Sequence, residues 1–152
     1  MNNEVWMRSA LNLAILAREA GEIPVGAVVV YEGKIVGRGF NQPISTEDPT
    51  AHAEIVALRE AARTLGNYRL VNCDLYVTLE PCLMCVGAMI HARIRKVIFG
   101  GMETKSGALT SRVMGAQLPC HNHKLLVEGG VLAEESTELL KSFFQERRLA
   151  QP

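Results

Sequence analysis

The sequence has few cysteines and no long apolar run, and both absences narrow the classes of protein it can encode. Four cysteines occur in 152 residues, and no stretch approaches the roughly 18 apolar residues that a membrane span needs. Asn12, Arg18 and Glu19 interrupt the apolar residues near the N-terminus, which argues against a secretory signal peptide. We therefore expect no membrane partner and a cytoplasmic location, where cysteines serve as metal ligands or buried thiols rather than disulfides.

The sequence also lacks an excess of charge of either sign. Its 16 basic and 16 acidic residues give a formal net charge of zero, whereas proteins that bind nucleic acid mainly through phosphates usually carry a basic excess. Any nucleic-acid partner must then be held by local patches. Residues 91–96 and 104–127 are basic and free of acids. Either a solvated surface or a contact with nucleic acid would explain this clustering of basic residues.

Aromatic residues are scarce at 5%, but apolar residues make up 48% of the chain, which is normal for a globular protein. We find no linker or repeat and treat residues 1–152 as one domain. Apolar spacing predicts helices over 3–20, 50–65, 81–92 and 132–148, strands over 25–31, 34–40, 75–79, 96–99 and 124–127, and a polar loop over 41–49. In the second helix, Ile55, Leu58, Ala62 and Leu65 are expected to face the core. Alternating strands and helices predict a layered α/β domain.

Two short motifs carry the chemistry of the chain: His52-Ala53-Glu54, and Pro81-Cys82-Leu83-Met84-Cys85. They offer one imidazole and two thiols to a metal, together with a carboxylate. Zinc with three protein ligands keeps its fourth position for water, as catalytic zinc sites do. The spacing H-x-E…P-C-x-x-C is the established signature of zinc-dependent nucleobase deaminases, so it is a known pattern that we apply to this chain.

The positions of these residues make a geometric prediction. Cys82 and Cys85 stand three apart where a helix should begin, so they share a face, and the free N–H groups there favour thiolates. His52 and Glu54 are two apart and can converge only at a helix entrance or in extended backbone. Two helix N-termini must therefore face one zinc ion, with Glu54 beside it as the residue that moves protons.

A structural zinc site is the alternative, and it would need a fourth protein ligand. Cys73, Cys120, His121 and His123 are the candidates. Cys73 lies beside an apolar strand and is interpreted as a buried thiol, and a second metal at residues 120–123 is disfavoured. A shuttle carboxylate beside the metal has no use in a purely structural module, which favours catalysis.

The wider sequence resembles the bacterial tRNA-specific adenosine deaminases. The resemblance extends over nearly the whole chain, through residues 41–44, 48–55, 67–70, 75–82, 87–91, 99–100, 143–144 and 147–148. It implies a three-layer cytidine-deaminase-like α/β fold with a mixed sheet of about five strands, and a homodimer with one Zn²⁺ per subunit. It further implies that the partner is a tRNA anticodon stem-loop, that of tRNA-Arg, whose wobble adenosine becomes inosine. A free-base or nucleoside deaminase, such as guanine deaminase, is the nearest alternative.

The resemblance also assigns roles residue by residue. His52, Cys82 and Cys85 match the zinc ligands, and Glu54 matches the proton shuttle. Asn41 matches the residue that hydrogen-bonds the flipped-out base. The remaining positions correspond to base-pocket or RNA contacts: Val25, Ile44, Ala53, Leu79, Glu103, Lys105, Phe144, Arg147 and Arg148. Glu103 is a departure, because the family pattern has an aspartate before the lysine.

Overall fold

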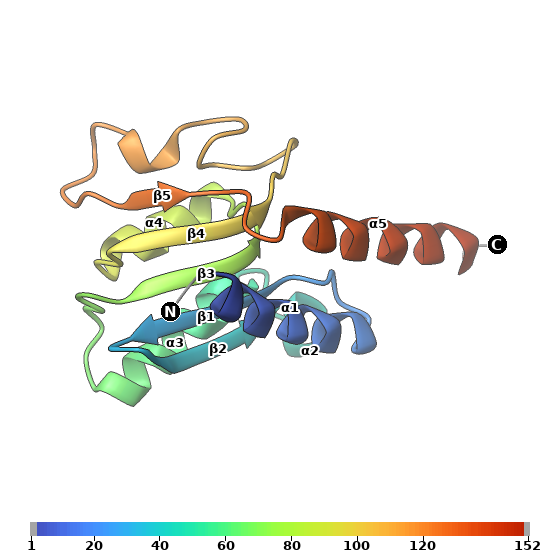
Figure 1. The fold of residues 1–152 in the computed structure, drawn as a ribbon, viewed down its shortest axis with the longest axis horizontal. Helices are drawn as coiled ribbons and strands as arrows, with labels where there is room; N and C mark the ends of the chain where they lie inside the picture. Colours follow the sequence, from blue (N-terminus) through green and yellow to red (C-terminus); the bar gives the residue numbers. More distant parts are fainter. Residues whose placement is uncertain (1–2, 151–152) are drawn as a thin grey trace.

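The computed structural model describes residues 3–150 and arranges five strands in one sheet (Figure 1). The strands are β1 (Gly26–Tyr31), β2 (Lys34–Phe40), β3 (Asp74–Leu79), β4 (Lys96–Gly101) and β5 (Leu126–Glu128), and their order is β2-β1-β3-β4-β5. β1 is antiparallel to both neighbours, whereas β3, β4 and β5 run parallel. The expected mixed sheet is confirmed.

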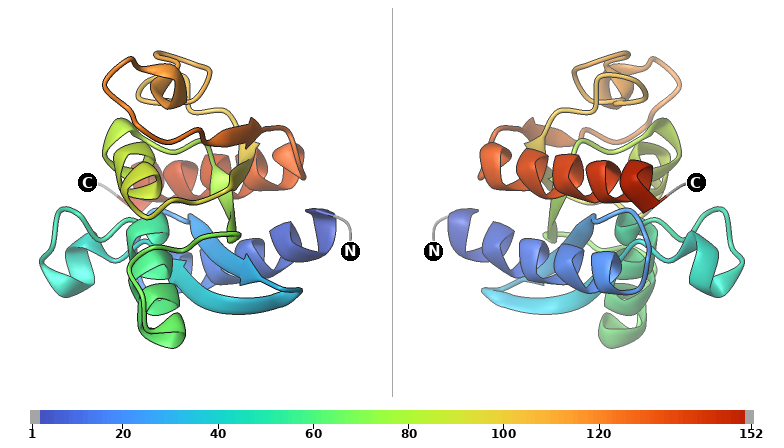
Figure 2. Two further views of the ribbon diagram at one scale, coloured as in Figure 1. Left: turned by 90° about the vertical axis from the view of Figure 1, so that its left-hand side faces the viewer. Right: turned by 90° about the vertical axis from the view of Figure 1, so that its right-hand side faces the viewer.

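Two pairs of helices cover the two faces of the sheet, which confirms the three-layer α/β arrangement (Figure 2). α1 (Asn3–Glu19) and α5 (Ala133–Ala150) lie on one face, and α3 (Ala53–Leu65) and α4 (Leu83–His91) on the other. Successive side chains of β1 alternate between the faces. Val28 and Val30 pack beneath α1, while Ala27 and Val29 pack beneath α3.

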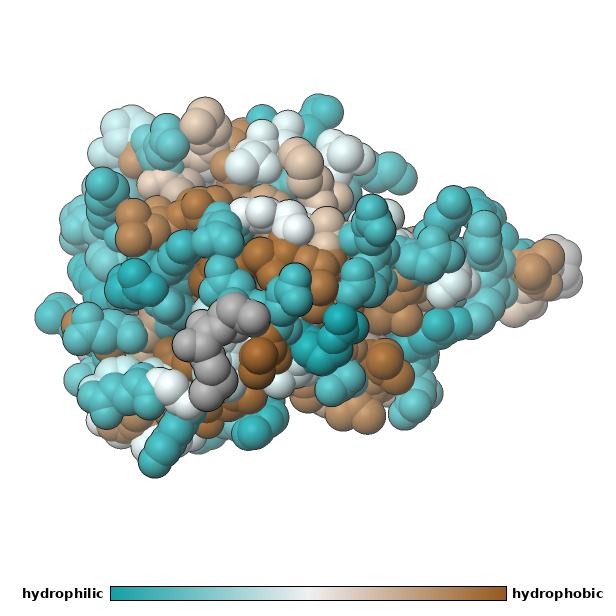
Figure 3. Space-filling model, in the orientation of Figure 1, coloured by the Kyte–Doolittle hydropathy of each residue, from teal (hydrophilic) through white to brown (hydrophobic). Residues whose placement is uncertain are grey.

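The face that carries α1 and α5 shows hydrophilic and apolar residues interspersed, and hydrophilic residues cover most of the part of α5 that projects beyond the sheet (Figure 3). No helix among residues 3–150 is long and apolar enough to cross a bilayer.

α3 approaches the sheet unusually closely, because small residues meet across the interface. Added Cβ atoms at Gly37 and Gly39 of β2 would lie 2.3 Å from the carbonyl oxygens of Ala57 and Ala53. The helix therefore packs on the sheet through alanines, and the prediction that its larger apolar residues form the inner face was wrong in part. Leu58 is buried, but Ile55, Ala62 and Leu65 are only half-buried at the edge of the core.

Two short helical segments occur in regions predicted as loops. α2 (Pro43–Thr46) interrupts the polar loop, and a 3₁₀ turn, η1 (Gly115–Gln117), lies in the long segment before β5. Pro43 stands in the first turn of α2, where its fixed φ suits a helix start. The sequence predicts a helix that begins at residue 81, but α4 begins two residues later, with Cys82 as its N-cap.

One edge of the sheet gathers the segments that carry the motifs. β2 is antiparallel to β1, and β1 is antiparallel to β3, so the carboxyl ends of β2, β3 and β4 meet the amino end of β1 at the same edge. The chain leaves β2 toward α3 and leaves β3 toward α4 from this edge. Residues distant in sequence are thereby brought together: Val25, Asn41, His52, Leu79 and Cys82.

Candidate active site

Two helix N-termini bring the three predicted metal donors together, as the spacing required. His52 is the N-cap of α3 and Cys82 the N-cap of α4, both with extended backbone, and Cys85 lies in the first turn of α4. The Nδ1 atom of His52 lies 3.6 Å from the Sγ atom of Cys82 and 3.6 Å from that of Cys85. All three donor atoms lie within 4.8 Å of one another.

These distances match what a zinc ion demands. Tetrahedral bonds of about 2.0–2.1 Å to nitrogen and about 2.3 Å to sulfur place N and S about 3.6 Å apart. One imidazole and two thiols are a typical zinc donor set, and three protein ligands leave a coordination position for a reacting molecule. His52, Cys82 and Cys85 would therefore hold one Zn²⁺ through Nδ1 and the two Sγ atoms.

The two thiols are unequal in acidity. The hydrogen bond from the Cys85 thiol, with further help from His52, lowers the pKa of Cys82 to about 4. The hydrogen bond to the Cys82 thiolate, together with burial, raises the pKa of Cys85. The free N–H groups at the start of α4 favour negative charge at this point. A dication takes the place of the protons that these groups otherwise share.

Glu54 lies beside the donors without joining them. Glu54 is 4% exposed, and its carboxyl group lies against the Cys85 thiol. Burial raises the pKa of Glu54 from 4.5 to about 7. A carboxyl group that titrates near neutral pH can both accept and return a proton, which is the property that a proton shuttle needs.

A cavity of about 260 Å³ opens directly above these groups. This volume lies near the lower end of small-molecule pockets, about 300 Å³, and suits one base better than a whole nucleotide. Eight of the predicted site residues line it: Val25, Asn41, His52, Glu54, Leu79, Cys82, Glu103 and Phe144. The Oδ1 atom of Asn41 accepts a 2.8 Å hydrogen bond from the N–H of Ala53, which turns the amide NH₂ of Asn41 toward a bound molecule.

The other predicted residues lie outside this cavity. Ala53 is fully buried in the core and acts through the hydrogen bond to Asn41, and Cys85 is buried beneath the cavity. Ile44 and Arg147 line an adjoining cavity of about 370 Å³, which shares Phe144 with the first. Lys105 and Arg148 are exposed.

Sequence reasoning missed five residues of the cavity wall: Ile23, Pro43, Glu80, Ser106 and Leu140. Ile23, Pro43, Ser106 and Leu140 come from loops, a short helix or α5, whose positions depend on tertiary packing. Glu80 directly precedes the Pro-Cys motif, and this position in the sequence was the one signal that could have identified it as a site residue. The sequence does not indicate that its carboxylate is buried.

The alternative metal ligands do not gather. Among residues 3–150, His52, Cys82 and Cys85 form the one cluster of three or more potential ligands. Cys73 is a fully buried thiol, as predicted. His123 contacts the carbonyl oxygen of Ile94 through Nε2 at 2.7 Å, so it does not combine with Cys120 and His121 into a second centre.

The two basic segments meet at the opposite edge of the sheet. Arg93, Arg95, His123 and Lys124 line a separate cavity of about 480 Å³ there. Arg95 already pairs with Asp74 at 2.5 Å, and Arg93 donates to the carbonyl of Ile90 at 2.9 Å. None of the metal donors lines this cavity, so the cavity above the metal donors is the better candidate site.

Comparison of the sequence with known protein families supports a zinc site at this position. Residues 1–101 match the family model described as the cytidine and deoxycytidylate deaminase zinc-binding region. The chain belongs to this family, and it is a hydrolytic deaminase that uses one Zn²⁺. His52, Cys82 and Cys85 are positioned to bind this ion.

Similar proteins narrow the relationship further. The tRNA-specific adenosine deaminase of Haemophilus influenzae is 52% identical over 147 residues, which cover 96% of this chain and 85% of that protein. That of Bacillus subtilis is 41% identical over 146 residues, or 96% of this chain and 91% of that protein. Curated tRNA-specific adenosine deaminases are thus similar to this chain over nearly its whole length.

Solved structures confirm the cytidine-deaminase-like fold. One from a study of A-to-I editing by tRNA:A34 deaminases at the wobble position has a TM-score of 0.87 and 43% identity, and the match covers 90% of this chain and 99% of that chain. A guanine deaminase from Bacillus subtilis has a TM-score of 0.64 and 32% identity, covering 100% and 98%. The fold of this chain is thus similar both to a tRNA:A34 deaminase and to a guanine deaminase.

Proposed function

We propose that residues 1–152 form one zinc-dependent deaminase domain that converts adenosine to inosine at the wobble position of a tRNA anticodon, that of tRNA-Arg. The observation that carries the proposal is a buried carboxylate beside a three-donor metal site, at the floor of a cavity that suits a single base. The names and the high identity of the similar tRNA deaminases favour adenosine in tRNA over free guanine. The cytoplasm is where such an enzyme would meet tRNA, and free cysteines suit that compartment.

Each group at the cavity floor has a part in the reaction. Bound zinc supplies Lewis acidity that makes water a nucleophile near neutral pH. Glu54 takes one proton of the attacking water and delivers it to the ring nitrogen beside the amine. It then takes the second proton from the hydroxyl that has been added to the ring and delivers it to the amine, which leaves as ammonia. One water is consumed, and the C–N bond to the amine is replaced by a C–O bond.

The walls of the cavity suit a base that has left its stack. Val25 and Leu79 offer apolar contact to the ring, and the amide NH₂ of Asn41 offers a hydrogen bond. A deaminase must take its target base out of the stack, and an unpaired anticodon loop makes that extrusion cheap. A single recognised loop also needs few phosphate contacts, which agrees with the zero net charge of the chain.

The rim of the cavity supplies the proposed RNA contacts. Glu103 forms part of the wall, and the Lys105 side chain is exposed beside it. Phe144 is 45% exposed on α5 and can stack on a base. Arg147 packs over the ring of Phe143, and both Arg147 and Arg148 lie in the last turn of the projecting helix.

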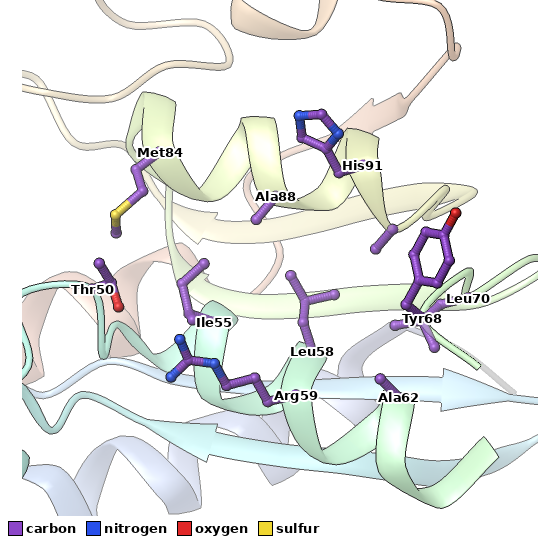
Figure 4. A pocket seen from close by; sticks show the side chains of 11 residues that line it. Thr50, Ile55, Leu58, Arg59, Ala62, Tyr68, Leu70, Met84, Ala88 and His91 are labelled. Atoms are coloured by element: carbon purple, nitrogen blue, oxygen red, sulfur yellow. The ribbon is translucent and has the colours of Figure 1, made fainter. Parts of the chain in front are cut away.

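We propose that the enzyme is a homodimer joined through a groove between α3 and α4. Its volume is about 450 Å³, and Ile55, Leu58, Met84 and Ala88 give it an apolar floor (Figure 4). Met84 is 39% exposed. The metal donors do not line this groove, so a second copy of the chain can cover it without closing the cavity.

The first test is ammonia release, with identification of the product, on an arginine anticodon stem-loop that carries adenosine at the wobble position. Guanine, cytidine and free adenosine are assayed in parallel. Inosine formed on the stem-loop alone supports the proposal, whereas activity confined to a small molecule overturns the RNA partner. The variant Glu54→Gln should keep its zinc and lose at least about 100-fold in kcat, since general acid–base catalysis contributes roughly 10²–10⁴-fold. Near wild-type activity in that variant would contradict the role of Glu54.

A further inference from the structure

Glu80 is a buried carboxylate that the chemistry above does not use. It follows β3 directly, and it is 2% exposed although it lines the cavity. Its side chain is not among the metal donors. A buried carboxylate is costly unless hydrogen bonds satisfy it, so its donors reveal what it does.

The donors all come from one segment, residues 103–111. Oε2 accepts hydrogen bonds from the backbone N–H groups of Leu109, Thr110 and Ser111 at 3.1, 2.8 and 2.9 Å. Oε1 accepts from the N–H of Glu103 at 3.1 Å and from the hydroxyl of Ser111. One carboxylate therefore ties the start of this segment to its end, and the chain between them forms a closed loop.

The backbone around the carboxylate leaves it no spare room. An added Cβ at Gly107 would lie 2.4 Å from the carboxyl carbon of Glu80. Behind it, the N–H of Ala108 donates to the carbonyl of Pro81 at 2.8 Å. Every hydrogen bond that reaches the carboxylate comes from an N–H or O–H donor, and such donors favour its ionised form. The carboxylate is thus an anion in a nest of N–H groups.

The closed loop forms part of the cavity wall. Glu103 and Ser106 line the cavity, and Lys105 is exposed between them. Residues 104–106 are exposed, whereas Gly107, Ala108 and Leu109 are buried. The N–H of Gly107 donates to the carbonyl of Glu103 at 2.9 Å, which closes the exposed turn on itself. The bond from Glu103 to Glu80 fixes the start of this turn to the cavity wall, and the bonds from residues 109–111 fix the chain that follows it.

We propose that Glu80 is a positioning residue for the RNA substrate: it closes the loop 103–111 and so holds Glu103, Lys105 and Ser106 at the mouth of the cavity. The substrate part of this inference rests on the proposed function. Side chains held in place before binding lose less conformational freedom when the substrate arrives. Glu80 should therefore affect substrate affinity and leave the proton transfers at Glu54 intact.

The first experiment measures the loop itself. In Glu80→Gln an NH₂ group takes the place of one oxygen of the carboxylate. This NH₂ group cannot accept a hydrogen bond, so the backbone N–H groups that face it lose their acceptor. We expect amide hydrogen exchange at Leu109, Thr110 and Ser111 to accelerate by at least about tenfold, as local opening becomes easier. Trypsin should also cleave faster after Lys105. Ser111→Ala removes a single donor, so it should shift both readouts in the same direction by less, and it serves as the second variant if Glu80→Gln does not fold.

The matched control is Glu128→Gln. Glu128 accepts hydrogen bonds from Asn3 at 2.8 Å and from Lys96 at 2.7 Å, and it lies in β5 away from the cavity. This control variant should leave exchange and cleavage in the loop at wild-type rates. Unchanged exchange in Glu80→Gln, or equal acceleration in Glu128→Gln, would overturn the inference.

The second experiment measures zinc content and steady-state kinetics on the stem-loop. For Glu80→Gln we expect full zinc content, kcat within about twofold of wild type, and KM raised by about tenfold, as expected when ordering costs fall on binding alone. A lower kcat at unchanged KM, or loss of zinc, would mean that Glu80 acts through Cys82, and it would refute the loop role. If the wild-type enzyme ignores the stem-loop, the proposed function fails, but the exchange and cleavage results still decide whether Glu80 holds the loop.

Discussion

Gly39→Ala should disable the enzyme without touching any group in the cavity. The added Cβ would lie 2.3 Å from the carbonyl oxygen of Ala53 and 2.6 Å from the N–H nitrogen of Ala57. Ordinary contact begins at 3.4 Å, so the first turns of α3 must move away from β2 by about 1 Å. His52 and Glu54 belong to this part of α3, and they move with it.

Two magnitudes follow from this displacement. Overpacking of a filled interface costs about 1–3 kcal/mol, which should lower the Tm by about 5 °C. A misplacement of about 1 Å at a reacting site costs about 100-fold in rate. We therefore expect kcat/KM, measured by ammonia release, to fall by about two orders of magnitude while far-ultraviolet circular dichroism stays native.

Gly87→Ala is the matched control. An added Cβ at Gly87 of α4 meets nothing within 4 Å, although Gly87 is only two residues from the metal ligand Cys85. Alanine in a helix interior is more stable than glycine by roughly 0.5–1 kcal/mol, so the Tm should rise slightly and the activity should stay. Wild-type kcat/KM in Gly39→Ala would refute the claim that close packing of α3 on β2 sets the positions of His52 and Glu54.

Three further predictions concern the metal, the groove and a buried acid. Cys85→Ser should lose its zinc and unfold at a lower temperature, whereas Cys120→Ser, at an exposed thiol, should keep both its zinc and its Tm; full metal content in Cys85→Ser would exclude Cys85 as a ligand. Met84→Glu should sediment as a monomer if the α3–α4 groove joins two copies, whereas Ile15→Glu, at a residue 43% exposed on α1, should not change the mass. Burial alone would raise the pKa of Glu22, but hydrogen bonds from Ser45 and Ile44 outweigh it and hold the pKa below 4.5. Its ionised form thus stabilises the fold above that pH, and the contribution disappears as the pH falls through the folded pKa. As the pH falls from neutral to below 4.5, the Tm of Glu22→Gln should therefore fall less steeply than that of wild type, and parallel curves would contradict this.

The sequence predicts best the parts of the site that local rules control. The sequence predicts helices from residues 50 and 81, and α3 and α4 begin at Ala53 and Leu83, within three residues of these positions. The strands follow from β-branched runs, so the metal donors could be placed at two helix starts from their spacing. The residues on the inner face of α3 could not be predicted in this way. Apolar periodicity favours Ile55 and Leu58 as the inner residues, but the alanines of the helix lie against the glycines of β2. The residue pattern within one helix does not indicate which strand packs against it.

The walls of the cavity lie further beyond sequence reasoning. Ser106 and Leu140 reach the cavity from segments that follow the Pro-Cys motif by more than twenty residues, and only the tertiary fold brings them there. α2 was predicted as a loop because its single turn is too short for apolar periodicity to show. It holds its place through Glu22, which accepts a 2.7 Å hydrogen bond from the N–H of Ser45.

Three buried carboxylates surround the cavity region, and their hydrogen-bond donors separate their roles. Glu22 accepts hydrogen bonds from two backbone N–H groups and one hydroxyl. Glu80 accepts hydrogen bonds from four backbone N–H groups and from the hydroxyls of Thr110 and Ser111. In both, these donors outweigh the effect of burial and lower the pKa, so the charge is fixed and can hold a loop. Glu54 lies deeper in the protein than the other two acids, and its few donors do not offset the burial, so its pKa rises to about 7. The one acid that the fold leaves short of donors is therefore the one that can change its protonation state at neutral pH, as the proposed deamination requires.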